Sequence, residues 1–276
     1  MFISFPVSSL LYVLCLKLKL LLLRYFKFLI NSKTRHGVHS PFVYKLIEDV
    51  IYDETPYNIY TEIECIRAEL LKNNSEIKIN DFGAGSRISK SNKRKISAIA
   101  KASVKPKKFS QLLFRLINHF KPENILELGT SLGITTLYLA SADSKKAVTT
   151  IEGCPEIARI ATDNFNKKNA KNIIQIIGNF DDVLPDYLKK IQTLDFVFID
   201  GNHLKEPTIR YFNWCLEKTH HSTVLIFDDI HWSKDMEETW EIIKANEKVK
   251  VTIDLFYMGL VFFRKEQPKE HFKIRY

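Results

Sequence analysis

The sequence has few cysteines and no long uninterrupted apolar run, and both absences narrow the possible classes of protein. Its four cysteines lie far apart among 276 residues, without a C-x-x-C pair or a cluster of cysteine and histidine. We therefore expect neither a disulfide framework nor a zinc–thiolate site, and a reducing compartment, the cytoplasm, fits best. The composition, 45% hydrophobic and 26% charged, is typical of a globular protein and not of a disordered or collagen-like one.

The apolar N-terminal segment is too short to predict a membrane span. Residues 1–16 carry no charge, but Pro6 interrupts them and four basic residues follow between Lys17 and Lys27. A spanning helix needs about 20 apolar residues, and the basic start and cleavage site of a secretory signal are missing. Residues 8–30 instead predict an imperfect amphipathic helix with a basic stripe. Docking on the domain that follows is the favoured interpretation, and peripheral contact with a membrane surface is the alternative.

Positive charge is concentrated in the first part of the chain. Residues 1–120 contain 20 Lys and Arg against 9 Asp and Glu, whereas residues 121–276 contain 21 against 23. The densest stretch, Arg87–Lys108, holds nine basic residues and no acidic one. It is either a solvated surface or a patch that steers an anionic partner such as nucleic acid or phospholipid. We predict two regions, a basic helical cap over residues 1–108 and a second domain over residues 109–276.

A helix start is recognisable at Ser40 and Pro41, a hydroxyl N-cap followed by proline at the first helical position. His36 and His39 come just before this start. They either meet an anion at the helix N-terminus or only hydrogen-bond the turn. A second helix is predicted over Tyr60–Lys72.

Two glycine-rich turns compete for a nucleotide-like ligand. The first, residues 81–86, leads into the basic stretch without a second strand. The second contains Gly129 and Gly133 and is followed by a helical pattern and then by the strand 147–151, which ends in Glu152. A Rossmann-type site needs strand, turn, helix and strand, with an acid about 20 residues after the turn. The second turn meets this requirement, so the first is interpreted as a structured loop that could fold over the site.

The spacing of the second turn distinguishes between cofactors. It reads E-x-G-x-x-x-G, whereas dinucleotide sites require G-x-G-x-x-G, so an NAD(P)-dependent oxidoreductase is disfavoured. A ligand with an amino-acid end and no pyrophosphate suits the turn better. From about Phe109 to Arg264 the sequence resembles the class I S-adenosylmethionine-dependent methyltransferases. More closely, it is similar to their metal-dependent O-methyltransferase branch, which includes catechol, caffeoyl-CoA and sugar O-methyltransferases.

The resemblance implies a cofactor site in which each strand end has a role. It implies that Glu127 contacts the methionine moiety, that Thr135 binds its carboxylate, and that Glu152 holds both ribose hydroxyls. The turn that begins at Gly178 would bind adenine. The implied cofactor-binding residues are Glu127, Gly129, Thr130, Ser131, Gly133, Thr135, Glu152, Gly178, Asn179, Phe180 and Asp200.

Acidic residues follow two further predicted strands. Residues 194–199 precede Asp200, and residues 223–227 precede Asp228 and Asp229. Parallel strands bring their carboxyl ends to one crevice, and clustered carboxylates repel one another unless they are protonated or bind a metal. We therefore predict a divalent metal, Mg²⁺ by preference, on these three acids. The catechol-type branch usually has Asp-Asn at the second strand end, whereas the sugar-methylating branch tolerates a second acid there. The alternative is that Asp200 and Asp228 only bind the cofactor's amino end and cap helices.

His203 follows Asp200 by three residues, where catechol-type relatives carry a lysine general base. Histidine suits that role near neutral pH, so His203 and Asp200 are the predicted catalytic residues. The alternative is that His203 is only a substrate contact.

The predicted fold class is α/β: a Rossmann-like, seven-stranded, mainly parallel sheet with a C-terminal antiparallel hairpin over residues 251–263 and helices on both faces. The predicted function is metal-assisted methylation of a hydroxyl on a small molecule, sugar or lipid-like acceptor by S-adenosylmethionine (EC 2.1.1.-). One alternative is a nucleic-acid-modifying methyltransferase that uses residues 87–108, although no N-P-P-Y-type motif is present. The other is a non-catalytic cofactor-binding or membrane-associated module. Association into a homo-oligomer stays open.

Overall fold

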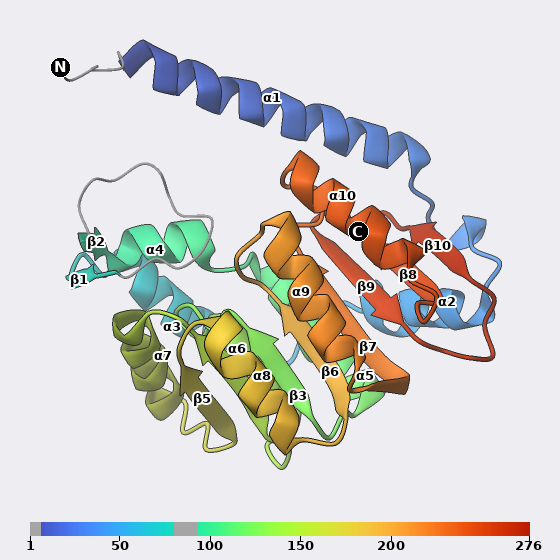
Figure 1. Ribbon diagram of the computed structural model, residues 1–276. Helices are drawn as coiled ribbons and strands as arrows, with labels where there is room; N and C mark the ends of the chain where they lie inside the picture. The colour runs from blue at the N-terminus through green and yellow to red at the C-terminus, as the bar shows by residue number, and fades with distance from the viewer. Residues whose placement is uncertain (1–6, 80–92) are drawn as a thin grey trace.

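A twisted central sheet with helices on both faces dominates the computed structural model, which describes residues 7–79 and 93–276 (Figure 1). The strands of this sheet are β3 (Ile125–Leu128), β4 (Val148–Glu152), β5 (Ile173–Ile177), β6 (Leu194–Ile199), β7 (Thr219–Asp228), β8 (Val251–Asp254), β9 (Met258–Phe262) and β10 (Glu270–Lys273). Their spatial order is β10-β8-β9-β7-β6-β3-β4-β5. Strands β3 to β7 are parallel to their neighbours among themselves, whereas β9 runs antiparallel to both β7 and β8.

The predicted fold class is confirmed, with one strand more than the seven expected. The extra strand, β10, pairs in parallel with the outer edge of β8. Just beyond it, the backbone of Lys33 bonds on both sides of Ile274: its N–H donates to the carbonyl of Lys273 at 2.7 Å, and its carbonyl accepts from Arg275 at 3.0 Å. The end of β10 therefore ties the segment after the first helix to the edge of the sheet.

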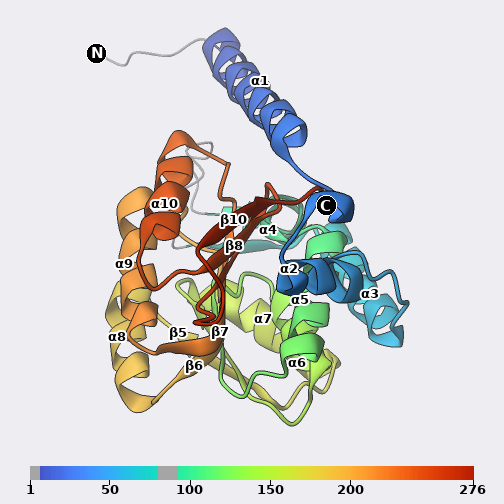
Figure 2. The same ribbon diagram turned by 90° about the vertical axis from the view of Figure 1, so that its right-hand side faces the viewer.

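Two layers of helices cover the sheet (Figure 2). One layer consists of α8 (Phe180–Lys190), α9 (Lys205–Leu216) and α10 (Lys234–Ala245). The other contains α2 (Pro41–Leu46), α3 (Asn58–Lys72), α5 (Lys107–Phe120), α6 (Ile134–Ala142) and α7 (Pro155–Lys167). All four residues of β3 are buried, and its alternate side chains enter different hydrophobic clusters: Leu126 joins the α8–α10 cluster, and Ile125 joins that of α2 and α5. Burial on both faces is the usual state of a parallel strand.

The N-terminal region shares its core with the sheet. The hydroxyl of Ser40 accepts a hydrogen bond from the N–H of Val43, which confirms the predicted helix start, and a π-helical segment, Ile47–Ile51, continues α2. Buried side chains such as Leu46 and Ile47 lie in one cluster with residues of α5 and of the sheet. The boundary between residues 108 and 109 stays a prediction.

The basic stretch is partly described. Strands β1 (Glu76–Lys78) and β2 (Lys93–Lys95) form a two-stranded hairpin, and α4 (Ile96–Ser103) follows. The predicted turn over residues 81–86 lies outside the described residues. His36 and His39 are both exposed, in and beside a 3₁₀ turn over Arg35–Gly37, and a role in anion binding stays a prediction.

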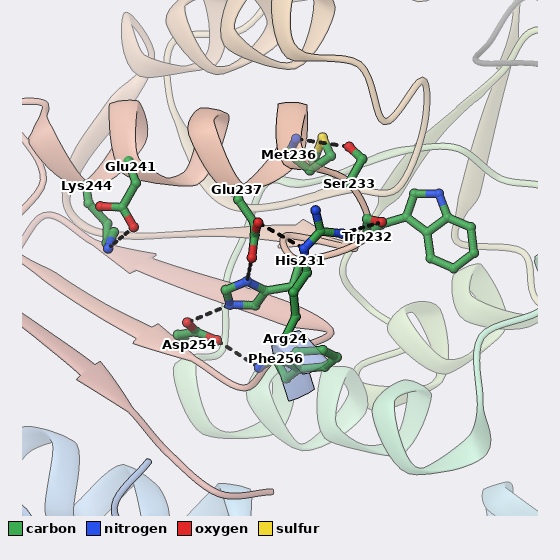
Figure 3. Close-up of polar contacts among 10 residues, drawn as sticks. All are labelled: Arg24, His231, Trp232, Ser233, Met236, Glu237, Glu241, Lys244, Asp254 and Phe256. Carbon is green, nitrogen blue, oxygen red and sulfur yellow. Dashed lines mark hydrogen bonds and ion pairs between the residues drawn. The ribbon is translucent and has the colours of Figure 1, made fainter. Parts of the chain in front are cut away.

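Helix α1 (Val7–Asn31) runs along the outside of the molecule, beside α10 (Figure 1). Its inner face contacts the turn between β8 and β9, where Phe28 packs on Phe256 with ring centroids 5.4 Å apart. Arg24 pairs with Glu237 of α10 at 3.0 Å, and Glu237 also contacts His231 (Figure 3). Within the described ranges, each helix is too short or too polar to pass through a bilayer.

Candidate active site

The turn after β3 is pressed against the end of β6, which leaves room for glycine alone. Gly129 has φ +104°, and a Cβ atom there would lie 2.0 Å from the carbonyl oxygen of Asp200. The N–H of Asp200 donates to the carbonyl of Leu128 at 2.8 Å. Gly133, at φ +80°, caps the start of α6. The turn and the start of α6 thus form one rigid corner beside Asp200, suited to a ligand that approaches the backbone closely.

Glu152 ends β4 beside this corner. One of its carboxylate oxygens accepts the N–H of Ser131 and the other that of Cys154, both at 2.9 Å. A hollow of about 230 Å³ opens here. Its lining includes Gly129, Ser131, Glu152, Asn179, Phe180 and Asp200. Six residues of the predicted cofactor set therefore meet at one opening over the carboxyl ends of the strands, where ligands bind in open α/β sheets.

Glu127 lies beneath the turn and is fully buried. Thr136 and Thr150 donate hydrogen bonds to its Oε2, while its Oε1 has no partner among the described residues. Burial raises the pKa of Glu127 to about 8, against the two hydroxyl donors. Thr130 also points inward, since its hydroxyl meets that of Thr150 at 2.6 Å. Thr135 is buried in the first turn of α6.

The turn after β5 completes this side of the site. The N–H of Gly178 donates to the carbonyl of Glu152 at 2.9 Å, and the Asn179 side chain caps α8 by accepting from the N–H of Asp181. The Phe180 ring lies against Gly201, where a Cβ atom would come within 2.6 Å of it. Of the three residues assigned to adenine by resemblance, Asn179 and Phe180 line the hollow, and Gly178 lies next to them in the turn.

Acidic side chains converge at the ends of β6 and β7, as predicted, but the set differs from the expected one. Donor atoms of Asp200, His203 and Asp228 lie within 4.8 Å of one another. His203 Nε2 is 3.5 Å from Asp200 Oδ1. Asp229 is not part of this group, and its backbone N–H donates to the carbonyl of Tyr257 at 2.7 Å. Asp200 belongs to both the hollow and the acidic group, so the two halves of the site share this residue.

Lys105 is the residue that the sequence reasoning missed. It lies between α4 and α5, and its side chain is 8% exposed. Its ammonium contacts the carboxylate of Asp228 and lies 3.7 Å from that of Asp200. In the sequence it is one of nine basic residues in a stretch interpreted as surface, and no local pattern separates it from the others.

Opposite charges set the protonation of this group. Although burial opposes its charge, the carboxylates of Asp200 and Asp228 raise the pKa of Lys105 above its usual range. Burial likewise opposes the charge of His203, but the hydrogen bond to Asp200 raises its pKa to about 9. Asp200 is also buried, yet Lys105 and His203 hold its pKa below the usual range. The site therefore contains an ionised Asp200 between two cations at neutral pH.

Backbone strain is concentrated around the site. Among the described non-glycine residues with left-handed backbone are Ser131, Asn202, His203 and Asp229, which have φ of +48°, +70°, +38° and +53°. Each lies just beyond the end of β3, β6 or β7. Non-glycine residues in this region cost about 1–3 kcal/mol and cluster at functional sites. Two of these residues, Ser131 and Asn202, line the hollow.

The predicted metal ion fits this arrangement poorly. The donors are suitable in kind, and Asp228 Oδ1 is buried without a hydrogen-bond partner in the described part of the chain. However, the ammonium of Lys105 already contacts Asp228 Oδ2 and lies 3.7 Å from Asp200 Oδ2. A second cation in contact with the same carboxylates would be repelled at this distance. No step is therefore assigned to a metal.

Comparison with known proteins agrees with the fold and with the turn after β3. Residues 126–230 match the family described as "Methyltransferase domain". A catechol O-methyltransferase from Niastella koreensis is 33% identical over 126 residues, which cover 45% of this chain and 55% of that protein. The O-methyltransferase imqG of Aspergillus flavus is 27% identical over 114 residues, 39% of this chain and 45% of that protein. The chain thus spans about half the length of the curated relatives it matches.

The matches to solved structures cover a larger part of the chain than the matches to these two relatives. An O-methyltransferase from Bacillus cereus in complex with SAH has a TM-score of 0.54 at 19% identity, and the match covers 79% of this chain and 94% of that one. TomG, an O-methyltransferase from Streptomyces achromogenes solved with SAM, has a TM-score of 0.50 at 22% identity, covering 59% and 82%. At these identities the likeness shows the fold alone. The family match over residues 126–230 and the shared fold both agree with the resemblance to the class I S-adenosylmethionine-dependent methyltransferases.

Proposed function

We propose that the protein transfers a methyl group from S-adenosylmethionine to a hydroxyl of a small molecule, sugar or lipid-like acceptor. The observation that carries the proposal is the position of Glu152, whose carboxylate ends β4 and lines the same hollow as Gly129 and Asp200. A carboxylate there can accept two O–H donors of a ribose. The relatives named as O-methyltransferases support the choice of oxygen as acceptor atom.

The cofactor, when bound, supplies an electrophilic methyl group on a sulfonium. Glu152 would hold the ribose, and the unpartnered Oε1 of the buried Glu127 would face its amino-acid end. Asp200 borders both the hollow and the acidic group, so an acceptor hydroxyl beside it would lie next to the methyl group. Holding the two reactants in line accounts for most of the rate gain in such a displacement.

His203 would accept the proton that the hydroxyl loses as the new O–CH₃ bond forms and the S–CH₃ bond breaks. Because Asp200 raises the pKa of His203 to about 9, most of the imidazole is protonated at neutral pH. The neutral form that can act as a base increases as the pH rises toward that value. We therefore expect the methylation rate to increase between about pH 7 and about pH 9.

Titration calorimetry with S-adenosylhomocysteine tests the cofactor site directly. The wild-type protein should bind one equivalent, and Glu152→Gln should weaken binding by about 10- to 100-fold, the effect of losing charge-assisted hydrogen bonds. Glu156→Gln removes the same charge from an exposed position four residues away and should leave the affinity unchanged. Absence of binding to the wild-type protein would overturn the proposed function.

The acceptor class needs a transfer assay. Labelled S-adenosylmethionine would be offered with phenols, sugars and long-chain alcohols in separate reactions, and with RNA in another. Recovery of the label in the methyl ether of a small hydroxyl compound supports the proposal. Label in RNA alone would replace it by the nucleic-acid alternative.

A second proposal concerns the outer face of α1, which we infer lies on an anionic membrane surface. Leu23, Phe26 and Ile30 on this face are 65%, 60% and 84% exposed. Exposed Lys19 and Lys27 lie on the same face at helical spacing. Apolar side chains flanked by lysines complement a membrane with anionic headgroups.

Vesicle flotation tests this second proposal. The full chain should float with vesicles of phosphatidylcholine and phosphatidylglycerol in equal parts and much less with phosphatidylcholine alone. Ile30→Glu should reduce flotation with the mixed vesicles, whereas Glu156→Gln should not. Equal recovery in the absence of lipid, or dimerisation that Ile30→Glu abolishes, would contradict it.

A further inference from the structure

The side chain of Lys105 reaches the acidic cluster from the N-terminal region. Its ammonium contacts Asp228 and lies 3.7 Å from Asp200 Oδ2, and it stands 5.7 Å from the centroid of the Phe198 ring. Only 8% of the side chain is exposed, although lysine is almost never buried without a partner. Removing the charge from water is unfavourable unless opposite charges surround it, as the two carboxylates do here.

The backbone of Lys105 is fixed as well as its side chain. Arg67 of α3 donates a 2.6 Å hydrogen bond to the carbonyl of Lys105. Glu64 accepts from Arg67 at 3.0 Å and from the hydroxyl of Tyr138 at 2.9 Å. Pro106 follows directly and begins α5 as its N-cap. The lysine therefore does not depend on a flexible loop for its position, because α3, α5 and α6 hold it.

A divalent ion on Asp200, His203 and Asp228 would lie about 2.0–2.6 Å from each donor atom. The donor atoms lie within 4.8 Å of one another, and the Lys105 ammonium already pairs with two of these three residues, Asp200 and Asp228. Two cations on one pair of carboxylates repel strongly in a partly buried site. A divalent ion would therefore have to displace Lys105 from these carboxylates.

We propose that Lys105 is the resident cation of the Asp200–Asp228 pair and takes the place of a divalent metal ion in this protein. The inference rests on the proposed function, because it describes the acceptor side of that site. It also restricts the acceptor. An ammonium donates hydrogen bonds but offers no open coordination positions, so it can hold one hydroxyl oxygen without chelating two. A single hydroxyl is then sufficient, and a vicinal pair is not required.

Mn²⁺ binding, followed by electron paramagnetic resonance, tests the inference without an activity assay. The wild-type protein should show no Mn²⁺ site that depends on Asp228. Lys105→Ser should create one, with at least a 100-fold gain in Mn²⁺ affinity, and Lys105→Ser combined with Asp228→Asn should lose it again. Lys107→Ser removes a lysine from an exposed position two residues away and should behave as wild type.

The comparison of the wild-type protein with Asp228→Asn decides the question even if Lys105→Ser fails to fold. A wild-type Mn²⁺ site that Asp228→Asn abolishes would overturn the inference. So would a folded Lys105→Ser that gains no site. Titration of S-adenosylhomocysteine on the same samples distinguishes the two proposals. If the wild-type protein does not bind S-adenosylhomocysteine, the proposed function is wrong. If it binds both S-adenosylhomocysteine and Mn²⁺ at Asp228, only the inference about Lys105 is wrong.

Discussion

The two sides of the site are assembled from different parts of the chain. The cofactor side comes from the ends of consecutive strands, with Gly129, Glu152 and Gly178 in order along β3, β4 and β5. On the acceptor side, Asp200 and Asp228 at the ends of β6 and β7 meet Lys105, which precedes the sheet in sequence and is held by Arg67 of α3. The first side depends on turns that are local in sequence. The second depends on how the N-terminal region packs, so the two should respond differently to substitution.

The largest effect is expected where the two sides touch. Gly129→Ala places a methyl group on the backbone of Asp200, at a φ of +104° that alanine avoids, and should cost about 3 kcal/mol or more. S-adenosylhomocysteine affinity should fall at least about 100-fold, as measured by calorimetry. Gly37→Ala is the matched control, since its added methyl group meets only the flexible side chain of Lys33. Unchanged affinity in Gly129→Ala would mean that the turn does not form the cofactor site.

The contact of α1 should be separable from the cofactor side. Phe28 is 4% exposed and packs on Phe256. Truncation of such a buried ring to alanine costs about 3 kcal/mol of stability. Phe28→Ala should therefore speed deuterium exchange in residues 19–31 by roughly 100-fold without a change in S-adenosylhomocysteine affinity. Phe26→Ala, at a 60% exposed position, should leave exchange as it is. A parallel loss of cofactor affinity in Phe28→Ala would show that α1 and the cofactor side are coupled.

A smaller, pH-dependent effect is expected inside the cofactor side. Burial raises the pKa of Glu127 from 4.5 to about 8, so the folded protein keeps a proton that the unfolded chain releases. Glu127 therefore lowers stability progressively as the pH rises from about 5 to about 8. Glu127→Gln removes this loss of stability. The melting temperature of Glu127→Gln minus that of the wild-type protein should therefore increase by several degrees between about pH 5 and about pH 8. Glu123→Gln, at an exposed position, should show no such trend.

The smallest effect is expected from the ion pair on α1. Arg24 and Glu237 are 23% and 33% exposed, and partly solvated pairs contribute about 0–1 kcal/mol. Arg24→Met should change the deuterium exchange rate of α1 less than about fivefold. Added salt should reduce the difference in this rate between the wild-type protein and Arg24→Met. An effect as large as that of Phe28→Ala would mean that charge, and not the aromatic contact, holds the helix.

The parts of the structure that could be predicted are those that follow from the local sequence pattern or from the topology of parallel strands. Strands 173–177 and 194–199 have the predicted bounds, because short apolar runs between turn residues leave little choice. The meeting of Asp200 and Asp228 followed from parallel topology alone. Strand β10 was missed because Glu270–Lys273 alternates weakly and is stabilised by the edge of β8.

The role of Lys105 could not be read from the sequence for a related reason. Its neighbours Lys101, Lys107 and Lys108 are exposed, and the burial of Lys105 among them depends on tertiary contacts with Arg67 of α3 and with Asp228 at the end of β7. Asp229 was included in the predicted metal set because it follows Asp228. Its left-handed backbone is a feature of the turn that sequence spacing does not reveal.

The backbone bonds between Lys33 and the residues after β10 have a consequence for the order of folding. The segment that anchors α1 is synthesised well before its partners, Lys273 and Arg275, which lie more than 200 residues further along the chain. Tyr276 is placed likewise, with its hydroxyl donating to the carbonyl of Lys108, at the start of α5. Such long-range contacts form late and slowly. During translation, the bonds of Lys33 and of Lys108 to these residues therefore cannot form until residues 273–276 have been made.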